Sequence, residues 1–171
     1  MATIGDEREF SRFVRAHTGD LLRTAYLLTG DGVAAEELVQ DTLVRLYPKW
    51  QLVAGAELPL AYVRRSLANG FVNSTRRASR REMTVEFLPE RPDTLDRPGQ
   101  LDDRDELWAM LRELPERQRA ALVLRYFHDL SDDEIGAALG ARIGTVRSLV
   151  SRGLAALREH AAAGRSSAWP A

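Results

Sequence analysis

Residues 131–159, SDDEIGAALGARIGTVRSLVSRGLAALRE, indicate how the C-terminal part of this chain folds. It contains two helical patterns that meet at Gly140, and glycine tolerates the positive φ angle that a tight turn between helices needs. Gly136 has no side chain that would keep the two helices apart. The apolar residues spaced to form a core between them are Ile135, Leu139, Ala141, Val146 and Leu149. The pattern predicts a helix-turn-helix.

The second helix of this motif has one apolar face and one small, polar and basic face. The apolar face consists of Val146, Val150, Leu154 and Leu157, at the three- and four-residue spacings of a buried helix face. The opposite arc carries Arg147, Ser148, Ser151, Arg152 and Ala155. Such a face fits the major groove of DNA, where arginine binds guanine and phosphate. We predict a DNA-reading helix, and an ordinary helical hairpin with a solvated face is the alternative.

The rest of the chain also has helical periodicity, so we predict an all-α fold. Residues 6–30 form one helical pattern that ends at Gly30, and Asp31 is a good N-cap for the next pattern, which Pro48 stops. Residues 51–58 are predicted to be a loop. A long helix is predicted to begin at Pro59, because proline is favoured in the first turn of a helix, and to continue to residue 81. Shorter helical patterns cover 106–114 and 115–130.

The segment 82–106 separates two helical parts of the chain. It contains three prolines and a glycine, and its nine acidic residues against three arginines give a net charge of −6. This composition is typical of a solvated, disordered linker. We therefore predict two small helical domains, residues 1–81 and 105–160, joined by an acidic flexible linker, residues 82–104. A small, polar tail, residues 161–171, is expected to fray.

The helix predicted from Pro59 concentrates positive charge in a chain whose net charge is −1. No acidic residue interrupts its arginines, which are Arg64, Arg65, Arg76, Arg77, Arg80 and Arg81. Arginines bind phosphates, amides such as Asn69 and Asn73 can contact base edges, and aromatic rings can stack on unpaired bases. We predict nucleic-acid contact for the arginines, and core packing for the two aromatic residues of this helix, Tyr62 and Phe71.

Composition excludes several classes of site. The chain has no cysteine, which removes disulfides, thiolate zinc sites and cysteine nucleophiles. Its histidines, His17, His128 and His160, are scattered without a catalytic partner or a metal-binding spacing, so we expect no enzyme activity, no metal and no cofactor. No apolar run is long enough for a membrane span and the start of the chain has no secretory signal. We expect a cytoplasmic protein that does not insert into membranes.

Three blocks of the sequence resemble one known family. LRELPERQRAALVLRYFHDL, together with the stretch quoted above, is similar to region 4 of bacterial sigma-70 factors of the extracytoplasmic-function (ECF) group. LLRTAYLLTGDGVAAEELVQDTLVRLYPKW resembles their region 2.1–2.2, and LPLAYVRRSLANGFVNSTRRASRR resembles regions 2.3–2.4. Within the second block, the residues AYLLTGD and AEELVQDTLVRLY are particularly similar to the SigE-type branch that is common in high-GC bacteria. The blocks come in the right order and cover roughly residues 10–159.

The resemblance implies a sigma factor that binds core RNA polymerase and promoter DNA and directs initiation. It implies contact with the −35 element by Arg142, Thr145, Arg147, Ser148, Ser151 and Arg152. It implies contact with the −10 element by Arg65, Asn69, Asn73, Arg76 and Arg77, beside a specificity loop at residues 53–58. Core polymerase would bind Glu36, Glu37, Gln40 and Asp41. The family also implies an anti-sigma factor as a further partner, and the free protein is expected to be a monomer.

Two residues depart from the family pattern. Arg142 stands where many relatives place a serine N-cap, a loss of about 1 kcal/mol. Gly153 replaces a common alanine inside the recognition helix, at a cost of about 0.5–1 kcal/mol.

Two other functions remain open from the sequence. A stand-alone helix-turn-helix regulator that needs no polymerase would explain the C-terminal half alone. A sigma-like module adapted to a protein partner would keep the packing and lose DNA binding. The arrangement of the two domains in the free protein is also open, and packing of one on the other would hide the basic helix.

Overall fold

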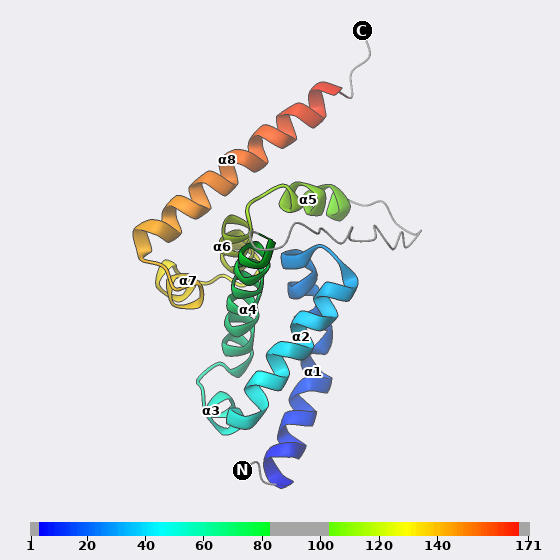
Figure 1. Cartoon of the computed structure of the whole chain (residues 1–171), viewed down its shortest axis with the longest axis vertical. Helices are drawn as coiled ribbons and strands as arrows, with labels where there is room; N and C mark the ends of the chain where they lie inside the picture. The colour runs from blue at the N-terminus through cyan, green and yellow to red at the C-terminus, as the bar shows by residue number, and fades with distance from the viewer. Residues whose placement is uncertain (1–3, 83–102, 168–171) are drawn as a thin grey trace.

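The computed structural model describes residues 4–82 and 103–167, and within these ranges every regular element is a helix (Figure 1). The elements are α1 (Ile4–Thr29), α2 (Gly32–Leu46), the 3-10 turn η1 (Tyr47–Lys49), α3 (Trp50–Ala54), α4 (Pro59–Glu82), α5 (Asp103–Arg112), α6 (Glu116–Tyr126), α7 (Asp132–Leu139) and α8 (Ile143–Ser167). The predicted all-α fold is confirmed. Most of the predicted acidic linker, residues 83–102, lies outside the described residues.

The first four α-helices form a bundle whose core is aliphatic. Leu21 and Leu28 of α1 and Leu67 of α4 are fully buried in it. The predicted boundary between α1 and α2 is confirmed, since Gly30 has a φ of 76° and the Asp31 carboxylate accepts a hydrogen bond of 2.7 Å from the Ala34 amide. This N-cap satisfies a backbone donor that the first turn of α2 would otherwise leave without a partner.

The prediction of a loop over residues 51–58 is wrong for its first half. Helix α3 occupies Trp50–Ala54 and buries Trp50 and Val53, which are three residues apart and face the bundle. The Trp50 ring lies 5.1 Å from the Phe10 ring and 5.0 Å from the Phe13 ring of α1. The burial of Trp50 and Val53 stabilises a short helix that the helix propensities of its residues alone would not predict.

The helix-turn-helix of α7 and α8 has the predicted turn. Gly140 ends α7 with a φ of 59°, and a Cβ atom on Gly136 would lie 2.6 Å from the Ala141 carbonyl oxygen. Both positions therefore need glycine. Helix α7 begins with a capping box, in which Ser131 and Glu134 satisfy each other's backbone amides. The predicted core residues Ile135, Leu139 and Val146 are buried, and Leu149 packs partly buried against them.

Helix α8 differs from expectation at two places. Gly153 is buried, and a Cβ atom there would lie 2.8 Å from Cδ1 of Leu122 on α6. The glycine thus lets α6 and α8 approach closely, and the packing gained in this way offsets the low helix propensity of glycine. The helix also continues to Ser167, past residue 160, where the sequence predicted the tail to begin. In Figure 1 its C-terminal half extends beyond the rest of the molecule.

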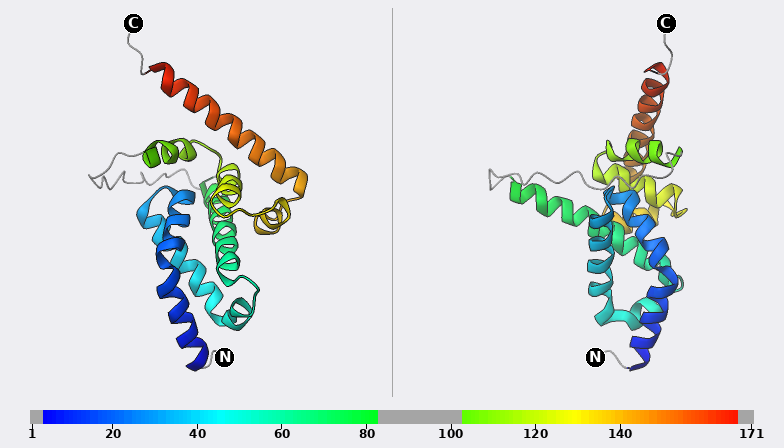
Figure 2. Two further views of the ribbon diagram at one scale, coloured as in Figure 1. Left: turned by 180° about the vertical axis from the view of Figure 1, so that it is seen from behind. Right: turned by 90° about the vertical axis from the view of Figure 1, so that its right-hand side faces the viewer.

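The two helical domains pack against each other in this structure, with α5, α6 and α7 placed along α1 and α4 (Figure 2). Arg119 of α6 takes part in this contact and is only 9% exposed. Its guanidinium donates to the Leu28 carbonyl at 2.6 Å, and to the carbonyls of Arg112 and Leu114 at 2.9 and 3.0 Å. One side chain therefore binds the C-terminal carbonyls of α1 and of α5, which belong to different domains.

A second polar contact joins the domains through Thr24 of α1 and His128. The Thr24 hydroxyl donates to the Asp20 carbonyl at 3.0 Å, so its oxygen is left to accept from Nε2 of His128, also at 3.0 Å. This assigns the neutral Nε2–H tautomer to His128. The other ring nitrogen, Nδ1, is buried with no hydrogen-bond partner, so the site has no acceptor for a second proton.

Candidate nucleic-acid interface

The recognition face of α8 is open to solvent. All six residues predicted to contact the −35 element are exposed, and they are Arg142, Thr145, Arg147, Ser148, Ser151 and Arg152. On the opposite side of the helix, Val146 is fully buried and Val150 is 8% exposed. The apolar side thus fixes the rotation of α8 about its axis, and the polar side is presented outward as a major-groove helix requires.

Arg147 is the one predicted −35 residue that the described residues hold in an ion pair. Its Nε donates to Oδ2 of Asp132 on α7 at 2.9 Å, although its side chain remains 72% exposed. Asp132 also pairs with Arg125 of α6 through its other oxygen. The side chain of Arg147 is therefore directed toward α7 in this structure.

The basic helix α4 presents a second polar stripe. Asn69, Asn73, Arg76 and Arg77 are exposed, Arg65 is partly exposed, and Nδ2 of Asn73 donates to Oδ1 of Asn69 at 2.6 Å. The C-terminal part of α4 projects from the bundle, as the right-hand view of Figure 2 shows. The structure therefore brings the predicted −10 residues together on one helix face and leaves most of them accessible, so the packed domains do not hide this helix as a whole.

Not all members of the arginine block belong to this stripe. Arg64 forms a two-pronged ion pair with Asp20 of α1, at 2.9 and 2.8 Å. The hydrogen bonds from Arg64 are the main reason that the pKa of Asp20 lies below its usual value, against the opposing effect of burial. Arg64 thus ties α4 to α1. Phe71 is 5% exposed and Tyr62 is partly buried, which confirms their prediction as packing residues.

The outer face of α2 combines acidic and apolar side chains. The predicted polymerase-binding residues Glu36, Glu37, Gln40 and Asp41 are all exposed there. Two valines of the same helix are exposed too, Val33 to 56% and Val44 to 70%. An accessible face with both charge and exposed apolar area is suited to a protein partner.

Sequence reasoning missed the residues of the domain contact, Arg119 above all. A signal existed, because Arg119 precedes Leu122 and Val123 by three and four residues and so falls on the buried face of α6. A charged residue at such a position indicates a buried cap or ion pair. No comparable signal marks Thr24 or His128, since 104 residues separate them and neither lies in a distinctive motif.

Both domains match parts of one family. Residues 13–81 match Sigma-70 region 2, and residues 104–157 match Sigma-70, region 4. The RNA polymerase sigma-E factor of Streptomyces coelicolor is 38% identical over 156 residues, which cover 91% of this chain and 88% of that protein. The ECF RNA polymerase sigma factor SigE of Mycolicibacterium smegmatis is 37% identical over 161 residues, which cover 90% of this chain and 62% of that protein.

The fold of this chain is also similar to those of sigma factors in solved structures. A chain of the co-crystal structure of the sigma factor RpoE with the anti-sigma factor NepR from Bartonella quintana superposes with a TM-score of 0.69 at 28% identity, over 90% of this chain and 96% of that one. A chain of the complex of CnrH with the cytosolic domain of CnrY gives a TM-score of 0.58 at 21% identity, over 92% of this chain and 90% of that one, which indicates a shared fold.

Proposed function

The chain belongs to the ECF sigma factors of the sigma-70 family, and we propose which of its surfaces bind promoter DNA and core RNA polymerase. It is a sigma factor, which binds core RNA polymerase and directs initiation at promoters. The stand-alone regulator is not supported, because the family matches cover both domains and not only the helix-turn-helix.

The first proposed surface is the exposed face of α8, which would contact the −35 element in the major groove. The observation that carries this proposal is that all six candidate residues are exposed while Val146 and Val150 anchor the opposite side. Arg142 and Arg152, which form no ion pair with the described residues, are free to contact guanine edges or phosphates. Ser148 and Ser151 leave room for a close approach of α8 to the bases.

The second proposed surface is the stripe on α4, which would bind the opened −10 strand. Asn69 and Asn73 offer amide donors and acceptors to unpaired bases, while Arg76 and Arg77 offer charge to phosphates. Phe71 does not take part, because it is buried in the bundle. Stacking on a base therefore has to come from residues other than Phe71 or from the guanidinium planes.

The third proposed surface is the outer face of α2, which would bind the polymerase. Its acidic residues suit a basic partner and its two exposed valines supply apolar contact. A factor that works with polymerase on chromosomal DNA acts in the bacterial cytoplasm, as an initiation factor with no reaction of its own. None of the described helices has the length and apolarity of a membrane span.

We include an anti-sigma factor among the proposed partners. The sigma factor RpoE was crystallised in complex with the anti-sigma factor NepR, and CnrH was solved in complex with CnrY. Such a partner would compete with polymerase for the faces of both domains.

The test is run-off transcription with sigma-free core polymerase and a library of genomic promoters, combined with a pull-down of core enzyme by the tagged chain. We expect stable binding to core and initiation from promoters that share one −35/−10 pair. Binding of the free chain to DNA without any binding to core polymerase would overturn the proposal. Substitution of Gln40 and Asp41 by alanine should weaken the pull-down while leaving DNA binding unchanged.

A further inference from the structure

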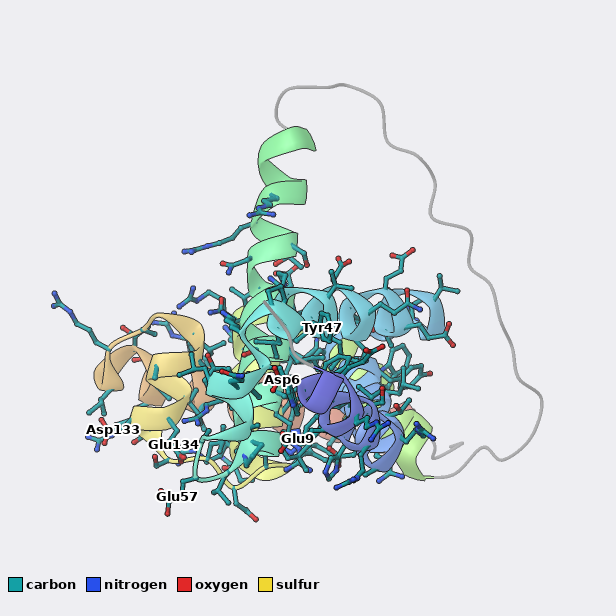
Figure 3. The ribbon with its side chains drawn as sticks, turned by 90° about the horizontal axis from the view of Figure 1, so that it is seen from below. Asp6, Glu9, Tyr47, Glu57, Asp133 and Glu134 are labelled. Atoms are coloured by element: carbon teal, nitrogen blue, oxygen red, sulfur yellow. The ribbon has the colours of Figure 1, made fainter. Side chains whose placement is uncertain are left out.

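The first turn of α7 faces one arginine from each proposed DNA-binding surface. Oε1 of Glu134 lies 3.9 Å from Nη1 of Arg65 on α4, and Oδ2 of Asp132 accepts from Nε of Arg147 on α8 at 2.9 Å. Glu134 and its neighbour Asp133 are labelled on α7 in Figure 3. Arg65 and Arg147, which belong to different domains, therefore converge on the same helical turn.

The acids of this turn are held as fixed, charged acceptors. The capping box fixes Glu134, whose Oε2 accepts from the Ser131 amide at 2.9 Å and from the Ser131 hydroxyl at 3.0 Å. These hydrogen bonds lower the pKa of Glu134, so the carboxylate is ionised at neutral pH. Asp132 is held from its other side by Arg125. Fixed carboxylate oxygens offer arginine the same kind of acceptor as phosphate oxygens do.

The geometry also sets a limit on DNA binding. Promoter positions −35 and −10 are about 25 base pairs apart, or about 85 Å of duplex at about 3.4 Å per base pair. In this structure Arg65 and Arg147 meet at one helical turn, which is about 5.4 Å long. The packed chain cannot contact both elements at once, so the domains have to separate before initiation.

On the premise of the proposed DNA-binding surfaces, we propose that the acidic turn Ser131–Glu134 is an autoinhibitory element. It competes with the −35 element for Arg147 and with the −10 strand for Arg65. Its hold on Arg65 also favours the closed arrangement of the two domains. Promoter DNA has to displace this turn from both arginines, and the domain contact through Arg119 and His128 is broken in the same step.

The chain offers matched variants that test this idea. Glu134→Gln keeps a residue that suits the capping box and removes the charge facing Arg65. Asp132→Asn removes the charge facing Arg147. Asp133→Asn makes the same change in net charge in the same turn, and the described residues show no ion pair for Asp133. The Asp133 variant therefore reports the effect of charge alone.

Domain closure is measured by energy transfer in the full chain. The protein has no cysteine, so dyes placed at Ala16→Cys on α1 and Ala162→Cys on α8, both exposed positions, label one site in each domain. We expect Glu134→Gln and Arg65→Gln to lower the transfer efficiency, and Asp133→Asn to leave it unchanged. Equal efficiency in all four proteins, each confirmed as helical by circular dichroism, would overturn the closing role of the turn.

Competition is measured by the anisotropy of a labelled −35 duplex and a labelled −10 single strand, with sequences taken from the run-off promoters. Asp132→Asn should tighten duplex binding about two- to fivefold, the range of an exposed ion pair, and Glu134→Gln should tighten strand binding similarly. Weaker duplex binding by Asp132→Asn would mean that Asp132 positions Arg147 for DNA, and would overturn the proposal. So would equal gains in the Asp133→Asn control.

The same assay separates this inference from the proposed function. Arg152→Ala should weaken duplex binding whether or not the turn is inhibitory. An unchanged affinity there would refute the assignment of the α8 face, while the energy-transfer result would still decide on closure.

Discussion

Trp108 of α5 stacks on Tyr26 of α1, with ring centroids 5.2 Å apart, and its indole nitrogen donates to the Tyr26 carbonyl oxygen at 3.1 Å. The indole ring also occupies the space beside Gly30, where a Cβ atom would overlap it. Gly30 therefore has two roles, since it ends α1 with a positive φ and leaves room for Trp108 of the second domain to pack against the first.

Gly30→Ala should destabilise the protein by at least about 1 kcal/mol, because alanine is strained at a φ of 76° and its methyl group would displace Trp108. The matched control is Gly32→Ala, two residues later, where a Cβ atom meets nothing within 4 Å. Urea unfolding followed by circular dichroism measures both. Equal midpoints for the two variants would contradict the role assigned to Gly30.

Arg119→Met should lower the free energy of unfolding by about 1–3 kcal/mol, because it leaves buried carbonyl acceptors of both domains without a donor. Methionine keeps much of the apolar volume of the side chain, so the loss reports the hydrogen bonds. The control is Arg23→Met, at an exposed position of α1. Urea midpoints again measure the change, and a similar loss in both variants would refute the prediction.

Acidification should open the domain contact through His128. Burial, and next the positive charge of Arg64, lower the pKa of this imidazole from 6.5 to about 4, while Asp20 and Asp129 oppose the shift. When the domains separate, the pKa returns toward 6.5, so the open form binds more protons between these two values. Domain closure is therefore undiminished above pH 6.5 and weakens as the pH falls toward 4.

The measurement for His128 is the energy transfer between labels on α1 and α8, from pH 7.5 to pH 4.5. His128→Gln should abolish the pH dependence, because glutamine can still donate to Thr24 but does not titrate. His17→Gln, on the first domain, should retain it. A pH dependence that survives in the His128 variant would show that another group is responsible.

Gly136→Ala should disrupt the helix-turn-helix, because the added Cβ would lie 2.6 Å from a backbone oxygen, and no side-chain rotation relieves that contact. We expect a loss of at least about 1 kcal/mol and weaker binding to a −35 duplex. Gly144→Ala, in the first turn of α8, meets nothing within 4 Å and should bind normally. Thermal melts and anisotropy separate the two, and identical behaviour would contradict the argument.

Arg152→Ala should weaken binding to −35 DNA and reduce the slope of log K against log salt by about 1, as the loss of one phosphate or base contact requires. Arg15→Ala, which removes an exposed arginine of α1, should leave both unchanged. A titration at several salt concentrations provides the test.

The sequence predicted those features that depend on local chemistry. Gly30, Asp31, Pro59 and Gly140 each mark a helix boundary by a property of a single residue, and the structure places a boundary at each. The helix over Trp50–Ala54 was missed because its stability comes from aromatic contacts with α1, far away in the sequence. The recognition face could be predicted from periodicity, because exposed and buried positions alternate along a helix at intervals of three and four residues.

The domain contact could not be predicted in the same way. Its hydrogen bonds join residues 82, 91 and 104 positions apart, and they involve backbone carbonyls, a hydroxyl and a half-buried histidine that no periodic pattern selects. The role of the acidic turn was hidden for another reason. As a local sequence Ser131–Glu134 is explained completely by capping, and its second use depends on two arginines brought to it by other helices.

The position of α7 between α4 and α8 has a thermodynamic consequence. In the closed arrangement Glu134 faces Arg65, and both promoter DNA and polymerase bind the open arrangement. Whichever ligand binds first therefore supplies free energy of domain opening that the second ligand no longer has to supply. The factor by which bound polymerase raises the affinity for promoter DNA must then equal the factor by which promoter DNA raises the affinity for polymerase. Loss of the Glu134 charge would reduce both factors equally, because it would lower the free energy that is needed to open the two domains.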